Sequence, residues 1–529
     1  MLLTTSVRAA CARAGAGAGA GRARSSVAAA TATVAAPSDA ADARPADWER
    51  ARPFQDIPGP KPLPLLGNTP RFLPGIGEYG KKDMLELQHM LRRQYGDMVR
   101  VSNVLGRKDM LWVFDPKITE KMYRNEGKWP IREGIKTIHY YRTVQRKEKF
   151  EGALGTVSTQ GKEWYDFRTQ VNQPLMQRKS ANQYYTPVND VAEDFIARMR
   201  DLRDENNELP ADFINELYKW SLESITMVAL DTRIGCLAPN LPKNSEPQGL
   251  IDAVQVMLEA FYKLDLKPSL WRIMSTPMWR RFVGAMDYLT DVAEKYINEA
   301  IANKKKNPDR PPSILEKLME KDPKVARVMA SDMLVGGVDT TSHLSASLLF
   351  HLAKNPEVQR RLREEMRRVL PSKTTVITED LTNEMPYLKA CLKESLRIFP
   401  IAMANVRETP ADVVLGDYQV PKGTDVMMCH MVMSRDEKNF ARPMEFVPER
   451  WVRGSPEAHT ASPFATMPFG FGPRMCIGRR FAEMEVFTLV AKVIRNFWVE
   501  YHYGDELLFE SKTLNSISMP LKFRLIDQD

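Results

Sequence analysis

The chain has 529 residues, of which 43% are hydrophobic and 27% are charged, and its formal net charge is +8. This composition predicts a large soluble core, and the absence of any run of eighteen apolar residues argues against a membrane-spanning helix. The modest, dispersed charge does not favour nucleic-acid binding. The five cysteines are odd in number and widely scattered, which indicates a reducing compartment rather than a disulfide framework; they are Cys11, Cys236, Cys391, Cys429 and Cys476.

Residues 1–38 are basic, rich in alanine and glycine, and contain no acid. Half of the net charge comes from four arginines in this segment: Arg8, Arg13, Arg22 and Arg24. Such a start, without the apolar core of a secretory signal, predicts a mitochondrial transit peptide, and an ordinary disordered tail is the alternative. We expect residues 39–56 to form a linker and residues 57–529 to form one folded domain.

The predicted domain opens on a proline-punctuated segment, Ile57 to Asn68, which suits neither a helix nor a central strand. Helical periodicity dominates from there onward. Asp322 followed by Pro323, and Asn355 followed by Pro356, predict helix starts with proline at the first helical position. A strand and turn pattern covers Val413 to Met428. The sequence therefore predicts a mainly α fold with small β-sheets.

Two helical stretches carry polar residues at informative spacings. Trp164 and Arg168 are four residues apart and so share a helix face, although a tryptophan packed beside a surface arginine would look the same. The stretch LVGGVDTTS, Leu334 to Ser342, places two glycines inside a helix, each costing about 1 kcal/mol relative to alanine. Small residues there would let a flat group approach the helix. The alternative is helix packing with a hydroxyl bonded back to the preceding turn.

The stretch LKACLKESLRIFP holds Glu394 and Arg397 one helical turn apart among apolar residues. A buried pair of this kind needs a further partner, because an uncompensated buried charge is costly. Lys389 and Lys393 also lie four residues apart in this stretch, an arrangement of like charges that is mildly destabilising or simply a solvated helix face.

The stretch FGFGPRMCIGRR, Phe469 to Arg480, places one cysteine between glycines and arginines. Zinc would need more ligands at short spacing, and a cysteine nucleophile would need an orienting histidine. A haem iron needs only one axial thiolate. The following helix would lower the pKa of the Cys476 thiol through its N-terminal dipole, and Arg474 would pair with a carboxylate on the edge of the ligand.

The stretch FGFGPRMCIG resembles the cysteine-loop signature F-x-x-G-x-R-x-C-x-G of the cytochrome P450 family at every fixed position. This resemblance implies the single-domain fold of that family and haem b held by the thiolate of Cys476, with Phe469 and Arg474 also at the cofactor. It further implies that Trp164, Arg168 and Arg407 bind the haem propionates. By the same resemblance, Asp339 and Thr340 are the catalytic pair that delivers protons to oxygen.

The segment FVPERW resembles the P-E-R segment of the family, so that Arg450 would complete a structural triad with Glu394 and Arg397. The pattern around Lys389 and Lys393 is similar to the mitochondrial branch, as are Arg479 and Arg480 after the cysteine. This implies an adrenodoxin-type ferredoxin as electron donor on a basic surface made of Lys389, Lys393, Arg479 and Arg480. Nothing in the chain resembles a flavin or nicotinamide fingerprint.

The basic, aromatic stretch from Leu266 to Val283, with Trp271 and Trp279, corresponds to the membrane-dipping substrate entrance of mitochondrial members. We therefore expect a mitochondrial monooxygenase on the matrix side of the inner membrane, in peripheral contact with that membrane. It would hydroxylate a lipophilic sterol, steroid or xenobiotic with O2. The alternatives are an electron-independent haem-thiolate isomerase and a non-catalytic haem gas sensor or electron carrier. The sequence does not identify the substrate.

Overall fold

The structure is a computed structural model that describes residues 44–529, except 74, 76, 106, 133, 134, 240, 243, 268 and 307–310. The predicted transit peptide, residues 1–38, and residues 39–43 of the predicted linker lie outside the described residues. Arg44 to Asp529 make up one structural unit. Within the described ranges, none of the helices is both long and apolar enough to cross a membrane.

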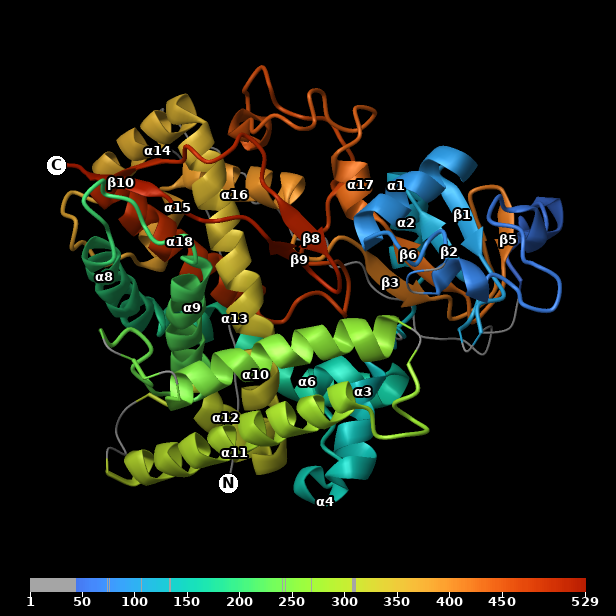
Figure 1. Cartoon of the computed structure of the whole chain (residues 1–529), viewed down its shortest axis with the longest axis horizontal. Coiled ribbons are helices and arrows are strands. Elements are labelled where there is room, and N and C mark those ends of the chain that lie inside the picture. The colour runs from blue at the N-terminus through green and yellow to red at the C-terminus, as the bar shows by residue number, and fades with distance from the viewer. Residues whose placement is uncertain are drawn as a thin grey trace, which may run out of the picture. The chain divides into compact units, whose positions relative to one another are not determined.

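Helices form most of this unit, which confirms the mainly α prediction (Figure 1). In chain order they are α1 (Met84–Tyr95), α2 (Pro116–Arg124), α3 (Lys136–Tyr140), α4 (Lys147–Phe150), α5 (Gly155–Ser158), α6 (Gly161–Met176), α7 (Arg178–Asn182), α8 (Tyr185–Asp201), α9 (Ile214–Ala229), α10 (Glu246–Ala260), α11 (Pro277–Lys306), α12 (Ile314–Lys321), α13 (Pro323–Lys354), α14 (Pro356–Val369), α15 (Glu379–Asn383), α16 (Pro386–Ile398), α17 (His430–Ser434) and α18 (Arg479–Asn496).

The longest helix, α13, begins where the sequence predicts. Asp322 caps it by accepting a hydrogen bond from the Lys324 backbone N–H, and Pro323 occupies the first helical position, where its missing N–H costs nothing. Helix α14 starts after Asn355 in the same way, although the Asn355 side chain makes no capping bond. A proline that follows a capping-type residue therefore marks both starts correctly.

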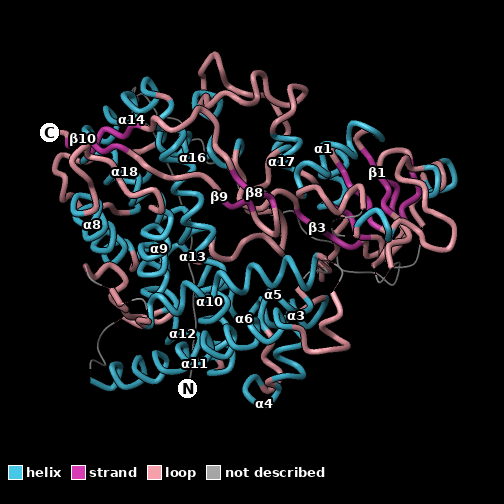
Figure 2. Tube along the Cα trace, viewed as in Figure 1, coloured by secondary structure: helices cyan, strands magenta, loops and turns pink. Residues whose placement is uncertain are grey.

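The strands are short and collect in four small sheets; Figure 2 shows a group of them set apart from most of the helices. The largest sheet has the order β1-β2-β6-β3, in which only β2 and β6 run parallel. The predicted strand and turn region contributes three strands to these sheets. The strands are β1 (Met98–Val101), β2 (Met110–Val113), β3 (Asn405–Glu408), β4 (Val413–Leu415), β5 (Tyr418–Val420), β6 (Asp425–Met428), β7 (Phe497–Glu500), β8 (Phe509–Ser511), β9 (Asn515–Ile517) and β10 (Arg524–Asp527).

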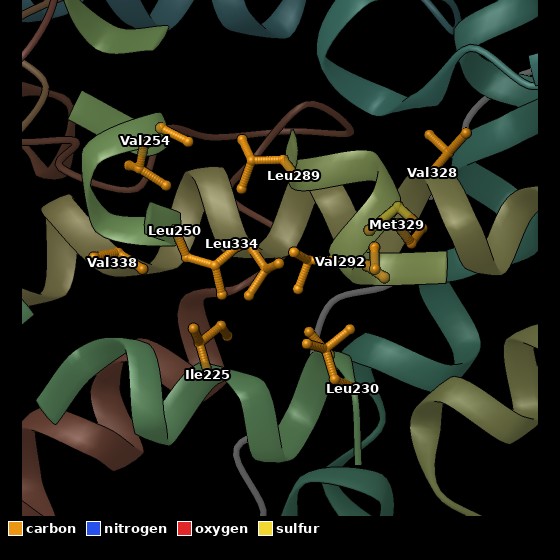
Figure 3. Close-up of a cluster of buried hydrophobic side chains, with 14 of the residues drawn as sticks. Ile225, Leu230, Leu250, Val254, Leu289, Val292, Val328, Met329, Leu334 and Val338 are labelled. Atoms are coloured by element: carbon orange, nitrogen blue, oxygen red, sulfur yellow. The ribbon is translucent and has the colours of Figure 1, made fainter. Parts of the chain in front are cut away.

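Helix α13 runs through the centre of the helical region and is buried along most of its length. Figure 3 shows its apolar side chains meeting those of α9, α10 and α11 in one cluster. The labelled members include Ile225 from α9, Leu250 from α10, Leu289 from α11 and Leu334 from α13. Because other helices pack around it, α13 holds the side chains of Asp339, Thr340 and Thr341, the DTT segment, at fixed positions inside the core.

Candidate functional site

The loop that carries Cys476 folds tightly just before α18. The Cys476 backbone N–H donates to the carbonyl of Phe469 at 2.9 Å, which closes the loop. Gly470 and Gly472 have φ angles of +70° and +75°, which favour glycine. A side chain at Gly472 would also be blocked, because its Cβ would lie 1.9 Å from Oε1 of Glu126. The glycines of the predicted signature are thus required by backbone conformation and by close packing.

Cys476 is exposed, whereas the other thiols of the described residues are buried: Cys236, Cys391 and Cys429. Burial nevertheless raises the pKa of the Cys476 thiol, while the Gly478 N–H and the guanidinium of Arg168 lower it. The sulfur is therefore accessible although protein atoms surround it. The expectation of a lowered pKa is wrong for the chain alone, because desolvation outweighs the favourable charges. A metal cation reverses that balance, since a coordinating thiol is deprotonated.

Three of the predicted cofactor-binding residues meet beside this loop. The guanidinium of Arg474 stacks on the Trp164 ring at 4.1 Å from its centroid, and that of Arg168 lies 6.0 Å from the same ring. Arg168 also donates to the carbonyl of Met475 at 2.9 Å. Helix α6 carries both Trp164 and Arg168, so their four-residue spacing brings them to one face. The alternative interpretation, a tryptophan packed beside a surface arginine, is wrong because Arg168 is buried.

Arg407, on β3, points to the same place but has a partner that the sequence does not reveal. Its Nε donates to Oε2 of Glu126 at 2.5 Å. The second oxygen of Glu126 has no hydrogen-bond partner in the described part of the chain. Burial raises the pKa of Glu126, and the positive charges of Arg407 and Arg474 lower it. Glu126 thus supplies one negative charge to this site.

A fourth guanidinium, from Arg132, completes an arginine cluster that we define as Arg132, Arg168, Arg407 and Arg474. Burial lowers the pKa of Arg132 and of Arg168 to about 10 each, and that of Arg474 to about 8. Repulsion from the other three arginines further lowers the pKa of Arg474, and only Glu126 opposes it among the main contributors. Four cations face one carboxylate, so the cluster suits a ligand that carries negative charge.

The adjacent glycines of α13 have different surroundings. A Cβ on Gly337 would lie 2.7 Å from Cγ1 of Ile225 on α9, whose neighbour Ser221 donates to the Gly337 carbonyl at 3.0 Å. A Cβ on Gly336 would meet nothing within 4 Å, and Gly336 is exposed. Gly337 therefore permits close helix packing, while Gly336 leaves open the helix face that also carries Thr340.

Asp339 and Thr340 face different surroundings. The Thr340 hydroxyl donates to the carbonyl of Gly336 at 2.7 Å, which is the back-bond that the alternative interpretation expected. The Asp339 side chain is 2% exposed, and its Oδ2 has no hydrogen-bond partner among the described residues. A buried carboxylate oxygen without a donor is costly, so this atom is a candidate for proton transfer. His343, which the sequence leaves as an ordinary core or surface histidine, lies 3.5 Å from Oδ1 of Asp339.

The structure brings the predicted triad together and buries it. Oε1 of Glu394 accepts from Nη2 of Arg397 at 2.8 Å and from Nε of Arg450 at 3.1 Å. Oε2 accepts from Nε of Arg397 at 2.9 Å and from the Trp451 indole at 2.8 Å. The remaining Arg397 donors reach backbone carbonyls. Each charged group of the triad therefore has hydrogen-bond partners that the fold supplies.

The predicted basic surface spans the outer faces of α16 and the start of α18. Lys393, Arg479 and Arg480 are exposed. Burial lowers the pKa of Lys389, and repulsion from Lys393 and Arg178 lowers it further. Arg479 pairs with Glu483 at 2.9 Å and lies 5.2 Å from the ring of Phe469. The four predicted cations are thus held near one another, and Arg178 adds to them.

The stretch from Leu266 to Val283 was predicted to lie at a membrane interface, and this prediction is wrong for its two tryptophans. Trp271 and Trp279 stack on each other at 4.6 Å and are each 6% exposed, so they belong to the core. The exposed side chains are instead Leu270, Ile273 and Met274. Amphipathic sequence alone did not separate these two groups, because tryptophan suits both a core and an interface.

Sequence reasoning did not predict Arg132, Glu126 and the buried Glu485 of α18. Arg132 belongs to no motif, and Glu126 follows α2 without any motif. Burial raises the pKa of Glu485 to about 8, and a hydrogen bond from Thr341 lowers it. The sequence contains no signal for these residues beyond their type, because their neighbours are distant in the chain.

Known proteins are similar to this chain over most of its length. The cytochrome P450 family model matches residues 57–526. The chain is 40% identical to a probable mitochondrial cytochrome P450 12a5 of Drosophila melanogaster over 498 residues, which cover 91% of this chain and 92% of the relative. It is 39% identical to cytochrome P450 CYP12A2 of Musca domestica, covering 92% and 93%. It is 40% identical to a probable mitochondrial cytochrome P450 301a1 of Drosophila melanogaster, covering 91% and 88%.

Proposed function

The chain belongs to the cytochrome P450 family and is a haem-thiolate monooxygenase, and we propose that it works in mitochondria with electrons from a 2Fe–2S ferredoxin of adrenodoxin type. In this proposal it hydroxylates a lipophilic sterol, steroid or xenobiotic. One oxygen atom of O2 enters a substrate C–H bond, and the other leaves as water after the uptake of two electrons and two protons. Support for the compartment comes from relatives that are named mitochondrial.

The arginine cluster and the accessible thiol fit haem b. The porphyrin carries two propionate carboxylates, which would offset two of the uncompensated positive charges of the cluster. Cys476 would supply the axial thiolate, and Trp164 would pack beside the propionates. Haem bound through a thiolate supplies oxygen activation, because the sulfur pushes electron density toward iron and favours O–O cleavage.

The residues of α13 have separate tasks in this proposal. Gly336 leaves room beside the helix, because nothing lies within 4 Å of the position that a Cβ would take. Asp339 takes up and releases protons at Oδ2, the oxygen without a hydrogen-bond donor. The Thr340 hydroxyl, which now donates to the Gly336 carbonyl, exchanges that acceptor for an oxygen atom of the reactants.

Electron entry depends on the basic surface. Ferredoxins of this type are acidic, so Lys389, Lys393, Arg479 and Arg480 steer and hold the partner, and the interaction weakens with ionic strength. The exposed apolar residues Leu270, Ile273 and Met274 support peripheral contact with the inner membrane. We propose residues 1–38 as the transit peptide that directs the chain to this compartment.

The observation that carries the monooxygenase proposal is the excess of buried positive charge beside an accessible cysteine. The test is reconstitution of the purified holoenzyme with adrenodoxin-type ferredoxin, its reductase, O2 and a panel of sterols and insecticide-like compounds. We expect a hydroxylated product, and no product when ferredoxin is replaced by a flavoprotein reductase. Product formation without ferredoxin or O2 would instead indicate the isomerase. A haem that binds no member of the panel with a spectral shift would indicate the sensor.

A variant pair sharpens the donor assignment. Lys393→Glu should raise the KM for ferredoxin roughly 10-fold, because one attraction becomes a repulsion, with little change in kcat at saturating ferredoxin. The matched control is Lys147→Glu on α4, which reverses an exposed lysine outside the basic surface. An equal change in KM for both variants would show that net charge, and not this surface, governs ferredoxin binding.

A further inference from the structure

The Asp339 carboxylate is held by side chains from three other places in the fold. Gln255 of α10 donates from Nε2 to Oδ1 of Asp339 at 3.2 Å. Nε2 of His343, one turn further along α13, lies 3.5 Å from the same oxygen. The hydroxyl of Tyr218, on α9, is hydrogen-bonded to His343, its oxygen lying 3.1 Å from Nε2 of His343. All four side chains are buried or nearly so, which fixes their arrangement.

The tautomer of His343 follows from its backbone contact. The N–H of Ile517, on β9, donates to Nδ1 of His343 at 3.2 Å. A ring nitrogen that accepts a hydrogen bond carries no proton, so the neutral ring has its proton on Nε2. Nε2–H therefore faces the Tyr218 oxygen and Oδ1 of Asp339. His343 thus donates to Tyr218 and lies 3.5 Å from the carboxylate, with its orientation set by the Ile517 N–H of β9.

Tyr218 strengthens the same arrangement. Burial raises its pKa, and the negative charge of Asp339 raises it further, so the hydroxyl keeps its proton. The ring of Tyr218 packs edge-on against the His343 ring with centroids 5.8 Å apart. The two rings thus hold each other in position beside the carboxylate.

The two carboxylate oxygens of Asp339 consequently differ. Oδ1 receives Gln255 and faces His343, whereas Oδ2 has no hydrogen-bond partner among the described residues. The Gln255 donor on Oδ1 fixes the rotamer of the carboxylate. An oxygen left without a donor is then the one able to accept a proton and pass it on.

We propose that His343 and Tyr218 are positioning residues for proton delivery: Tyr218 holds His343 beside Oδ1 of Asp339, where His343 and Gln255 fix the carboxylate, and Oδ2 is left as the atom that transfers protons. This inference rests on the proposed function of Asp339 and extends it to residues outside the DTT segment. His343 and Tyr218 touch neither substrate nor cofactor in this assignment and act only through Asp339.

The test measures oxygen reduction by the holoenzyme with reduced ferredoxin and no added substrate, in which O2, two electrons and two protons give hydrogen peroxide. We expect His343→Leu to slow this reaction several-fold and to raise its solvent isotope effect, because proton transfer becomes rate-limiting. His343→Gln, which retains an amide donor and acceptor, should recover much of the rate. Tyr218→Phe should have a smaller effect in the same direction.

The matched control is His351→Leu, which removes another buried histidine of α13, one that is hydrogen-bonded to Ser395 and not to Asp339. It should leave the solvent isotope effect unchanged even where it lowers the unfolding temperature. If His343→Leu behaves in the same way as this control, His343 is merely structural and the proposal is overturned.

A second measurement is independent of turnover. Unfolding midpoints of Asp339→Asn, His343→Leu and the double variant form a cycle, and we expect clear non-additivity, because each replacement removes the same contact. Additive effects would overturn the proposal. Failure of the wild-type enzyme to consume O2 with ferredoxin would instead overturn the proposed electron donor, and the unfolding cycle would still decide whether His343 and Asp339 are coupled.

Discussion

The triad and the arginine cluster both bury guanidinium groups, but they differ in how many of these cations share one carboxylate. In the triad, Glu394 bonds to both Arg397 and Arg450, and the remaining donors of Arg397 reach backbone carbonyls. In the arginine cluster, four cations share the single carboxylate of Glu126, and burial lowers the pKa of Arg474 to about 8. The donors of Arg474 also reach protein acceptors, so the two regions differ in charge: two cations share a carboxylate in the triad and four share one in the cluster.

This difference separates structural charge from binding charge. A buried ion is stable when its partners come with the fold, and it is strained when they must come from a ligand. Sequence spacing alone did not distinguish these cases, since Glu394 with Arg397 and Trp164 with Arg168 are both short-range helical pairs. The distinction lies in the partners that tertiary structure brings to each pair.

The largest expected effect comes from breaking the balanced region. Glu394→Ala would leave two buried guanidinium groups without a counter-charge, so we expect a loss of roughly 3 to 5 kcal/mol in the free energy of unfolding. Chemical denaturation of the purified protein would measure it. Glu357→Ala is the control, because Glu357 pairs with Arg360 at the same three-residue spacing but is exposed, and should change stability by about 1 kcal/mol or less. Equal losses in the two variants would contradict the distinction.

A smaller effect, on a different quantity, is expected from the unbalanced region. If Arg474 binds a haem propionate as we propose, Arg474→Gln relieves repulsion within the arginine cluster but removes a charge-assisted bond worth about 1.5 to 3 kcal/mol. Haem should therefore leave the protein roughly 10 to 100 times faster. Transfer to a haem scavenger, followed by absorbance, measures the rate. Arg435→Gln, a buried arginine outside both regions whose pKa is also lowered by burial, should cost stability without faster haem loss.

A further effect, measured as a slope against pH and not as a single loss, concerns a buried carboxyl group that belongs to neither region. Burial raises the pKa of Glu485 to about 8, well above the value of an exposed glutamate. The folded state therefore binds this proton more tightly than the unfolded state, and the stabilisation is full below about pH 4.5 and is lost as the pH rises through 8. Relative to Glu485→Gln, wild-type stability should fall by about 1.4 kcal/mol per pH unit at most between these values. Parallel pH curves for the two proteins would contradict the assignment.

The sequence predicted those features that depend on neighbours in the chain. The start of α13 at Asp322, the strands between Val413 and Met428 and the turn at Gly470 all follow from local backbone preferences. The mainly α fold class followed from helical periodicity, and the family followed from the motif that contains Cys476.

Features that depend on distant contacts were not predicted. Glu126 pairs with Arg407 across 281 residues, and Tyr218 reaches His343 across 125. The thiol pKa was predicted in the wrong direction, because the helix terminus is visible in the sequence whereas the extent of desolvation at Cys476 is not. The burial of Trp271 was missed for the same reason.

The close approach of Gly337 on α13 to Ile225 on α9 restricts which substitutions these two positions can accept during evolution. A methyl group at 337 would overlap the isoleucine, and α9 cannot retreat without losing the bond from Ser221 to the 337 carbonyl. Substitutions at the two positions should therefore arise as a pair, with a smaller residue at 225 whenever 337 is enlarged. Random libraries that vary 337 alone should be depleted of folded members.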